Sequence, residues 1–335
     1  MNGDRESSAR RRAAHRAALD HVLGLVAGAE WCASLVLRGS MSMCAWAGNL
    51  AREPADLDFV VLPESTWRPD ELDPYPYVDR FDVVQQWPEA AWGATEYDIW
   101  MDGEEEFETR GLHPRVSPDG LHWEIDATPA APPYGDLLDL LRQRPRAAPD
   151  VMIQADHAQV DGDWGYAYND AGGDETAGSR VIIPWRAEGL PPGQVQLDFA
   201  ADERLPEPPV WSLVPRADGR APAVLRTASR ELSLAWKLLW LQTDAATGTR
   251  SRSKDLYDAV LLAEDDRTRL APHLLRTVFR RRATDDFELE AIRLEDTDWA
   301  AFTAEHPRVH GTARQWLQRL GTALAPMLAV RDETD

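Results

Sequence analysis

Residues 35–62 read LVLRGSMSMCAWAGNLAREPADLDFVVL, a stretch that predicts a strand, a helix and a second strand. The apolar run at 34–37 has strand character and is stopped by Gly39, and residues 41–50 are helix-like. A second apolar strand runs from 57 to 62 and ends before Pro63. Together with the helical spacing of residues 9–29, the first seventy residues predict helix, strand, turn, helix, strand.

Two carboxylates mark the start of the second of these strands. Residues two apart in a strand face the same side, so Asp56 and Asp58 are expected to project together. Mg²⁺ prefers such hard oxygen ligands, usually one or two carboxylates together with substrate phosphates. Asp198 is a charged residue in the apolar strand 194–199, which is costly unless it is paired or metal-bound, and it is the candidate third metal ligand. Simpler interpretations remain open, because Asp56 could end a loop and Asp198 could face water on an edge strand.

The turn before the helix-like segment is a candidate phosphate site. Glycine at residue 39 lets the backbone approach a ligand closely, and amides at the start of a helix favour a phosphate. Ser40 can add a hydroxyl contact. Gly39 and Ser40 are therefore the candidate nucleotide-binding residues of this half of the chain.

The rest of the chain divides into a weakly patterned middle and a helical end. Between 63 and 150 we expect strands at 97–101 and 121–125 and a helix at 135–142. A loop rich in Gly, Asp and Asn follows at 161–178, and strands at 180–185 and 194–199 are joined by a hairpin turn at 189–193. After a Pro-rich link at 205–209, helices are expected at 231–242, 254–264, 272–282 and 312–330.

Lysine occurs at only two positions, Lys237 and Lys254. Lys237 interrupts a helix that is apolar nearly all round, and a buried ammonium is expensive unless it reaches an anion or a cleft. A lysine that extends to the helix surface is the alternative. Asp255 and Asp258 are three residues apart and are expected to share one face of the next helix. Asp255 could also serve only as an acid in the first turn of that helix.

Gly39-Ser40, Asp56-x-Asp58, Asp198, Lys237 and Lys254-Asp255-Leu256-Tyr257-Asp258 together resemble the AbiEii/AbiGii toxin family of nucleotidyltransferases, including the related MenT-type toxins. The resemblance covers the opening strand–helix–strand and most of 180–265. It implies an α/β fold of the DNA polymerase β-like nucleotidyltransferase type, a mixed sheet with flanking helices, plus a helical C-terminal lobe. The expected domains are 1–205, with an enlarged insertion at about 65–175, and 206–335.

The same resemblance implies roles for the matching residues. Asp56 and Asp58 would bind Mg²⁺, and Ser40 and Lys237 would contact the phosphates of a nucleoside triphosphate. Asp255 would be a further essential acid, which makes Asp56, Asp58, Lys237 and Asp255 the expected catalytic set. Asp198 takes the place of the third sheet carboxylate.

Composition limits the function that these residues can serve. A formal net charge of −21 opposes general nucleic-acid binding, which depends on many cationic contacts to phosphates. Local basic patches occur nevertheless, and Arg250, Arg252, Arg280 and Arg281 are the candidate contacts to an RNA, although a solvated helix face explains them equally well. With no long apolar run, no signal-peptide pattern and two cysteines, we expect a cytoplasmic protein with free thiols and no membrane partner.

The sequence therefore predicts an Mg²⁺-dependent nucleotidyltransferase. A substrate hydroxyl, by resemblance the 3′ end of a tRNA, would attack the α-phosphorus of an NTP and release pyrophosphate. A cognate antitoxin is a further expected partner. Two alternatives stay open: an acceptor hydroxyl on a small molecule or a protein, and a catalytically silent module that only binds.

Overall fold

The structure is a computed structural model, and it describes residues 2–62, 96–99, 106–108, 121–123, 131–162, 178–201, 205–243, 251–280, 287–292 and 298–329. The chain forms two compact units. Unit 1 comprises Met1–Val61 and Pro132–Asp335, and unit 2 comprises Leu62–Ala131. In unit 2 the described residues form a three-stranded antiparallel sheet in the order β4-β3-β5, made of β3 (Glu96–Ile99), β4 (Glu106–Glu108) and β5 (Leu121–Trp123).

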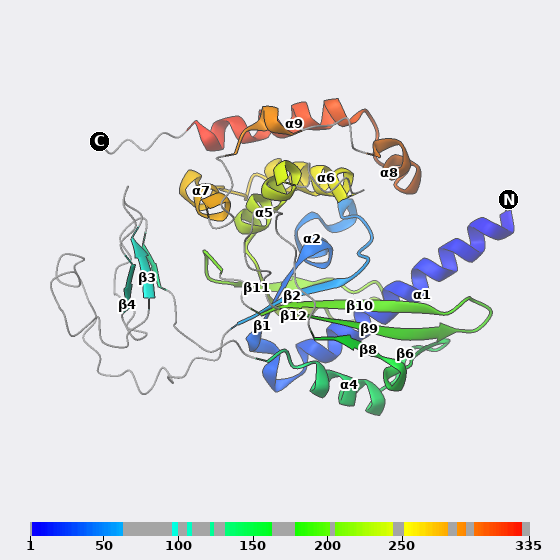
Figure 1. The fold of residues 1–335 in the computed structure, drawn as a ribbon. Coiled ribbons are helices and arrows are strands. Elements are labelled where there is room, and N and C mark those ends of the chain that lie inside the picture. Colours follow the sequence, from blue (N-terminus) through cyan, green and yellow to red (C-terminus); the bar gives the residue numbers. More distant parts are fainter. Residues whose placement is uncertain are drawn as a thin grey trace. The chain divides into compact units, whose positions relative to one another are not determined.

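Unit 1 is built on a nine-stranded mixed sheet (Figure 1). The strand order is β11-β12-β1-β2-β10-β9-β7-β6, and β8 pairs with β9 beside this path. Two neighbouring pairs, β1 with β12 and β2 with β10, run parallel, and the other pairs are antiparallel. The strands are β1 (Leu35–Arg38), β2 (Leu57–Val61), β6 (Arg146–Ala148), β7 (Val151–Ile153), β8 (Gln159–Asp161), β9 (Gly178–Ala187), β10 (Gly193–Ala200), β11 (Val210–Val214) and β12 (Ala223–Thr227).

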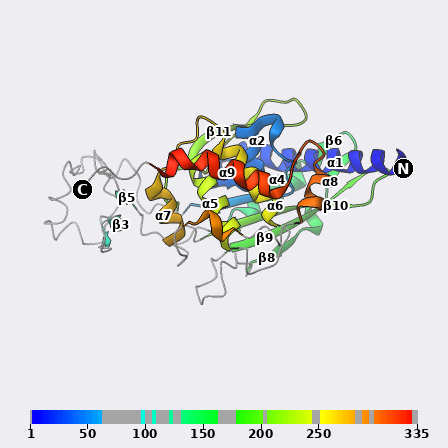
Figure 2. The same cartoon turned by 90° about the horizontal axis from the view of Figure 1, so that it is seen from above.

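Helices cover both faces of this sheet. Figure 1 shows α1 (Asn2–Ala27) and α4 (Tyr134–Gln143) on one side. On the other side lie α2 (Gly39–Ala47), α5 (Arg230–Thr243), α6 (Ser251–Ala263) and α7 (Pro272–Arg280). Figure 2 shows α9 (Ala313–Leu328) lying over α5 and α6, with α8 (Trp299–Glu305) beside it. None of the helices that the structure describes is long and apolar enough to span a membrane.

The core lies where the central strands meet these helices. All four residues of β1 are buried, and the rings of Phe59 and Phe199 stack across β2 and β10 with their centroids 5.6 Å apart. Burial of such side chains stabilises the fold by roughly 1.5–3 kcal/mol each. In α5 nine of fourteen residues are buried, which confirms that this helix is internal as its composition predicts.

Most predicted elements are confirmed. The predicted hairpin between β9 and β10 turns at Gly189, where φ is +70° and glycine is favoured. The structure also contains strands and a helix that were not predicted, namely β6, β7, β8, β4, β11, β12 and α8. The first three lie inside the expected insertion at 65–175 yet pair within the large sheet, and most of the predicted loop at 161–178 lies outside the described residues. The expected boundary near residue 205 stays a prediction, and β11 and β12, which follow it, belong to the same sheet.

Candidate active site

The turn from β1 into α2 brings glycine against a carboxylate. Gly39 has φ +72°, and a Cβ atom placed there would lie 2.1 Å from Oδ2 of Asp58. Both the left-handed backbone and the contact therefore require glycine. The N-cap residue of α2, Arg38, makes no side-chain capping hydrogen bond. This end of the helix is a suitable place for an anion.

Asp58 lies between two neighbouring strands of the sheet. It pairs in register with Arg38 of β1 on one side and with Asp198 of β10 on the other. The pKa of Asp58 is raised to about 7, first by burial and then by the negative charges of Asp56 and Asp198. The positive charges of Arg38 and Lys254 act against this rise. Asp56 and Asp198 are therefore near enough for their charges to act on Asp58, and the joint role of the three carboxylates as metal ligands stays a prediction.

Asp56 is partly exposed and is held by the serine of the turn. The Ser40 hydroxyl donates a hydrogen bond to Oδ1 of Asp56 at 3.3 Å. Ser40 itself is buried, at 2% exposure. In this structure its contact is to a carboxylate, and its contact to a triphosphate stays a prediction.

Asp198 has protein partners for both carboxylate oxygens. Arg180 donates to Oδ1 at 2.7 Å through Nε and to Oδ2 at 2.8 Å through Nη2. The side chain of Gln196 donates to Oδ2 at 3.0 Å. This fork-like pairing explains how the charge is tolerated in an apolar strand. The role of Asp198 as a metal ligand stays a prediction.

The carboxylates of Asp56 and Asp58 fit a magnesium site in which the protein supplies only part of the ligands. Among the described residues, no group of three or more His, Cys, Asp or Glu side chains is arranged to hold a metal ion. Asp56 and Asp58 nevertheless face one another closely enough for the charge of Asp56 to raise the pKa of Asp58, and a bound cation would relieve that repulsion. Mg²⁺ commonly takes one or two carboxylates and completes its shell with water and substrate phosphates. The residues therefore fit a metal that arrives with a nucleotide.

Lys237 is buried in α5 and held by the next helix. Its ammonium lies 2.6 Å from Oδ1 of Asp255 and 3.3 Å from Oδ2 of Asp258, which confirms that both acids share one face of α6. Burial lowers the pKa of Lys237, but the charges of these two acids outweigh it, and the pKa is raised overall. Burial likewise raises the pKa of Asp255, and the charge of Lys237 lowers it overall. The ion pair is therefore fully charged at neutral pH.

One residue of this cluster was missed by sequence reasoning. Arg52, between α2 and β2, donates through Nε to Oδ2 of Asp258 at 3.2 Å. Its side chain is 9% exposed. Burial lowers the pKa of Arg52, but the charges of Asp258, Asp255 and Asp56 raise it overall. No local pattern marks Arg52, because its partner lies 206 positions later in the chain.

Lys254 connects the two halves of the site. It is partly buried near the start of α6. Its charge lowers the pKa of Asp58 and also that of Asp255. Arg38 adds a second link, since its guanidinium lies 5.3 Å from the ring centroid of Trp236 in α5. The sheet carboxylates and the helical ion pairs thus form one continuous charged region.

The predicted nucleic-acid contacts fall at the limits of the described structure. Arg250 and Arg281 lie outside the described residues. Arg252 and Arg280 belong to α6 and α7 by their backbone. All four stay predictions.

A family model and a solved structure match much of the chain. Residues 139–324, more than half of the chain, match the family model described as "Nucleotidyl transferase AbiEii toxin, Type IV TA system". This match includes Asp198, Lys237 and Asp255, whereas Asp56 and Asp58 precede it. Among solved structures the chain is similar to MenT4, the nucleotidyltransferase toxin Rv2826c from Mycobacterium tuberculosis H37Rv, at 17% identity and a TM-score of 0.42, over 94% of this chain and 93% of that chain. None of the curated proteins compared with the chain matches it.

Proposed function

The chain belongs to the AbiEii family of nucleotidyltransferase toxins of type IV toxin–antitoxin systems, and from this membership we propose that it transfers a nucleoside monophosphate from an NTP to the 3′ end of a tRNA. The observation that carries the proposal is the single charged region formed by Asp56, Asp58, Lys237 and Asp255. We also propose that unit 1 has the DNA polymerase β-like fold, because paired carboxylates on a mixed sheet face a helical lobe that supplies cations.

In the proposed mechanism Asp56 and Asp58 would hold Mg²⁺. When bound, this ion lowers the pKa of the attacking hydroxyl and offsets charge on the triphosphate. Ser40 keeps Asp56 in place, and Gly39 leaves room for the carboxylate of Asp58. The unprotonated form of Asp58 is required, so the raised pKa of this residue couples metal binding to loss of a proton.

The triphosphate is proposed to lie between the N-terminus of α2 and the lysines of the helical lobe. The amides of α2 and the Lys237 and Lys254 ammonium groups supply positive charge from both sides. Lys237 carries three N–H donors, and the two aspartates of α6 account for two of them. Asp255 therefore orients the lysine, which gives the predicted essential acid a positioning role. Fixed charges of this kind provide most of the catalysis in phosphoryl transfer.

The test is Mg²⁺-dependent incorporation of label from each of the four NTPs into total tRNA. We expect label at the tRNA 3′ end with the intact chain and none with Asp58→Asn or Lys237→Met. Asp156→Asn is a matched control, because this carboxylate is 79% exposed and bonded only to Arg142 in the described contacts. Activity of the control shows that loss of a carboxylate as such is harmless.

Other results would contradict the proposal in distinct ways. Label in a protein or a small molecule instead of tRNA would move the acceptor, a result that the net charge of −21 favours over general RNA binding. Absence of label in every acceptor, with NTP and Mg²⁺ bound, would indicate a silent binding module. A cognate antitoxin belongs to the same proposal, and its addition is expected to suppress labelling or its effect on growth.

A further inference from the structure

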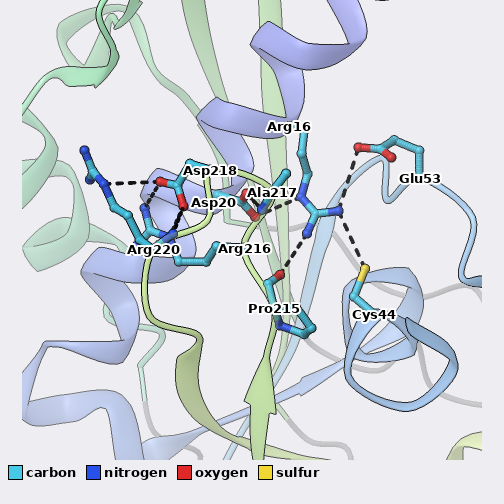
Figure 3. Close-up of polar contacts among 9 residues, drawn as sticks. All are labelled: Arg16, Asp20, Cys44, Glu53, Pro215, Arg216, Ala217, Asp218 and Arg220. Atoms are coloured by element: carbon cyan, nitrogen blue, oxygen red, sulfur yellow. Dashed lines mark hydrogen bonds and ion pairs between the residues drawn. The ribbon is translucent and has the colours of Figure 1, made fainter. Parts of the chain in front are cut away.

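The segment Gly48–Asp56, which we call the bridging loop, is contacted by both α1 and α6. From α1, His15 Nε2 lies 3.0 Å from the carbonyl oxygen of Ala55. Arg16 of the same helix lies 3.7 Å from the carboxylate of Glu53 (Figure 3). From α6, the Tyr257 hydroxyl donates to the carbonyl oxygen of Leu50 at 2.6 Å. Asp56 ends this loop, so the loop joins the sheet carboxylates to the helical lobe.

The central contact of the bridging loop is with the ion pair of the helical lobe. Arg52 Nε and Lys237 Nζ approach the same atom, Oδ2 of Asp258, at 3.2 and 3.3 Å. The other carboxylate oxygen, Oδ1, has no hydrogen-bond partner among the described residues, and Asp258 is 0% exposed. The charge of this buried carboxylate is therefore balanced by two cations that share one oxygen.

Charge balance shows what Arg52 contributes. Lys237 faces Asp255 and Asp258, and one ammonium group balances only one of these two carboxylates. Arg52 supplies the second positive charge. The charge of Lys254 also reaches Asp255, but in the described contacts Asp258 is paired with Arg52 and Lys237. Without Arg52, Asp258 would depend on Lys237 alone, close to Asp56, whose charge already reaches Arg52. A net negative charge here would repel a triphosphate and draw the ammonium of Lys237 toward the aspartates.

We propose that Arg52 is a positioning residue: by neutralising Asp258 it leaves the Lys237 ammonium available to the triphosphate of the nucleotide. This inference rests on the proposed nucleotidyltransferase function and adds a residue to that site. It also assigns the bridging loop a purpose. The loop sets the position of Asp56 at one end and the charge of the Lys237 cluster at its centre.

The first test compares four variants with the intact chain: Arg52→Met, Arg52→Lys, Asp258→Asn and the double variant Arg52→Met/Asp258→Asn. Arg52→Met is expected to raise the KM for NTP by about tenfold or more, which corresponds to the loss of one favourable charge contact, with a smaller effect on kcat. Arg52→Lys keeps the charge and is expected to recover part of the affinity. The double variant removes one charge of each sign and is expected to bind NTP better than Arg52→Met alone.

Rescue by the double variant separates charge balance from simple packing. If Arg52 were only a packing residue, a second substitution in the same contact would leave binding unchanged or weaken it further, and that result would overturn the inference. An Arg52→Met variant with the KM of the intact chain would overturn it as well. Circular dichroism melts identify folded variants. If Arg52→Met does not fold, Arg52→Lys and the double variant carry the comparison.

A second readout is independent of nucleotide transfer. Because the chain contains only two lysines, labelling with ¹⁵N,¹³C-lysine gives two Nζ signals, and a Lys254→Arg sample assigns them. We expect the Lys237 Nζ signal to shift in Arg52→Met and to return toward its original position in the double variant. An unmoved signal in Arg52→Met contradicts the inference even if transfer activity is present. A chain that shows the shift and the rescue but incorporates no nucleotide keeps the charge network and refutes the proposed function.

Discussion

At the scale of single residues, Gly39 has the least freedom to change. Its φ of +72° costs an L-residue about 1–2 kcal/mol, and a Cβ atom there would meet the Asp58 carboxylate at 2.1 Å. We therefore expect Gly39→Ala to lower the free energy of unfolding by about 1–3 kcal/mol and to abolish Mg²⁺–NTP binding. Urea unfolding and nucleotide titration measure the two effects.

Gly219→Ala is the matched control for this substitution. Gly219 has φ +70° but nothing within 4 Å of the added Cβ atom. It should show a comparable backbone cost and unchanged nucleotide binding. Equal binding by the two variants would mean that the contact between residue 39 and Asp58 has no role in the site.

Asp58 links the site to pH. Its pKa is raised from 3.8 to about 7, so the folded chain holds this proton more tightly than the unfolded chain does. The stability linked to this group is therefore greatest at acid pH and falls as the pH rises from about 4 to about 7. Asp58→Asn imitates the protonated form. Without divalent cations, it is expected to stabilise the chain by on the order of 4 kcal/mol above pH 7 and progressively less toward pH 4.

Thermal unfolding in EDTA across this pH range measures the difference between Asp58→Asn and the intact chain. Asp156→Asn serves again as the control, since its carboxylate is exposed and should give a difference near zero at every pH. A difference for Asp58→Asn that is constant with pH would contradict the raised pKa.

Sequence reasoning found some of these residues and missed others for physical reasons. Asp198 and Lys237 were recognisable because a charge within an apolar element is expensive and needs a partner, and Asp58 because it lies two residues from Asp56 at the start of a strand. Arg52 gave no such signal, since arginine in a polar loop is ordinary. The pairing of Asp198 with Arg180 depends on the register of β9 and β10, and two strands of this length allow several registers.

At the scale of elements, α1 fixes the bridging loop through one buried arginine. Arg16 donates to Oδ1 of Asp20 at 2.8 Å and to the carbonyl oxygen of Pro215 at 2.9 Å, and it also reaches Glu53 (Figure 3). Asp20 accepts a further hydrogen bond from the Ala217 amide. This one network joins α1, the bridging loop and the connection between β11 and β12.

Removal of this arginine is expected to be costly. Arg16→Met leaves the carboxylate of Asp20, which is 1% exposed, without its cation, and we expect a loss of about 3–5 kcal/mol in unfolding free energy. Because the bridging loop loses the contact to Glu53, NTP affinity should fall as well. Arg12→Met on the same helix is the control. Arg12 is exposed and bonded to Ser8, so its removal should change stability by no more than about 0.5 kcal/mol in chemical denaturation.

Elements were easier to predict than their arrangement. Long periodic segments such as α5 and α6 follow from the apolar pattern alone, and their predicted limits agree with the structure within a few residues. β11 was missed because it is an edge strand that exposes Trp211 and Leu213, so it lacks the alternation of a half-buried strand. The parallel pairing of β2 with β10 joins segments about 140 residues apart and has no local signature.

At the scale of the whole molecule, charge is distributed so that cations are placed where phosphates are expected. The chain carries a net charge of −21, yet both of its lysines lie beside carboxylates of the candidate site. Lysine is a compact point charge that suits a phosphate, whereas arginine provides the forked contacts seen at Asp198. Lysine and arginine side chains therefore differ in the contacts that they are expected to make in this region.

The division into two units leads to the last prediction. Every described residue of the candidate site belongs to unit 1, and β2, the last element before residue 62, pairs with β1 and β10 of the same unit. Unit 1 also contains its own core, which includes the stacked rings of Phe59 and Phe199.

Replacing residues 62–131 by a flexible linker of about 15 Gly and Ser residues, which spans roughly 20 Å, should therefore leave a folded chain. We expect a single cooperative unfolding transition and the Mg²⁺–NTP affinity of the full chain, both of which calorimetry measures. The same replacement in a Gly39→Ala background should bind no nucleotide, which shows that the affinity comes from the site described here. If the shortened chain folds but binds no NTP, unit 2 contributes to nucleotide binding and the prediction is wrong.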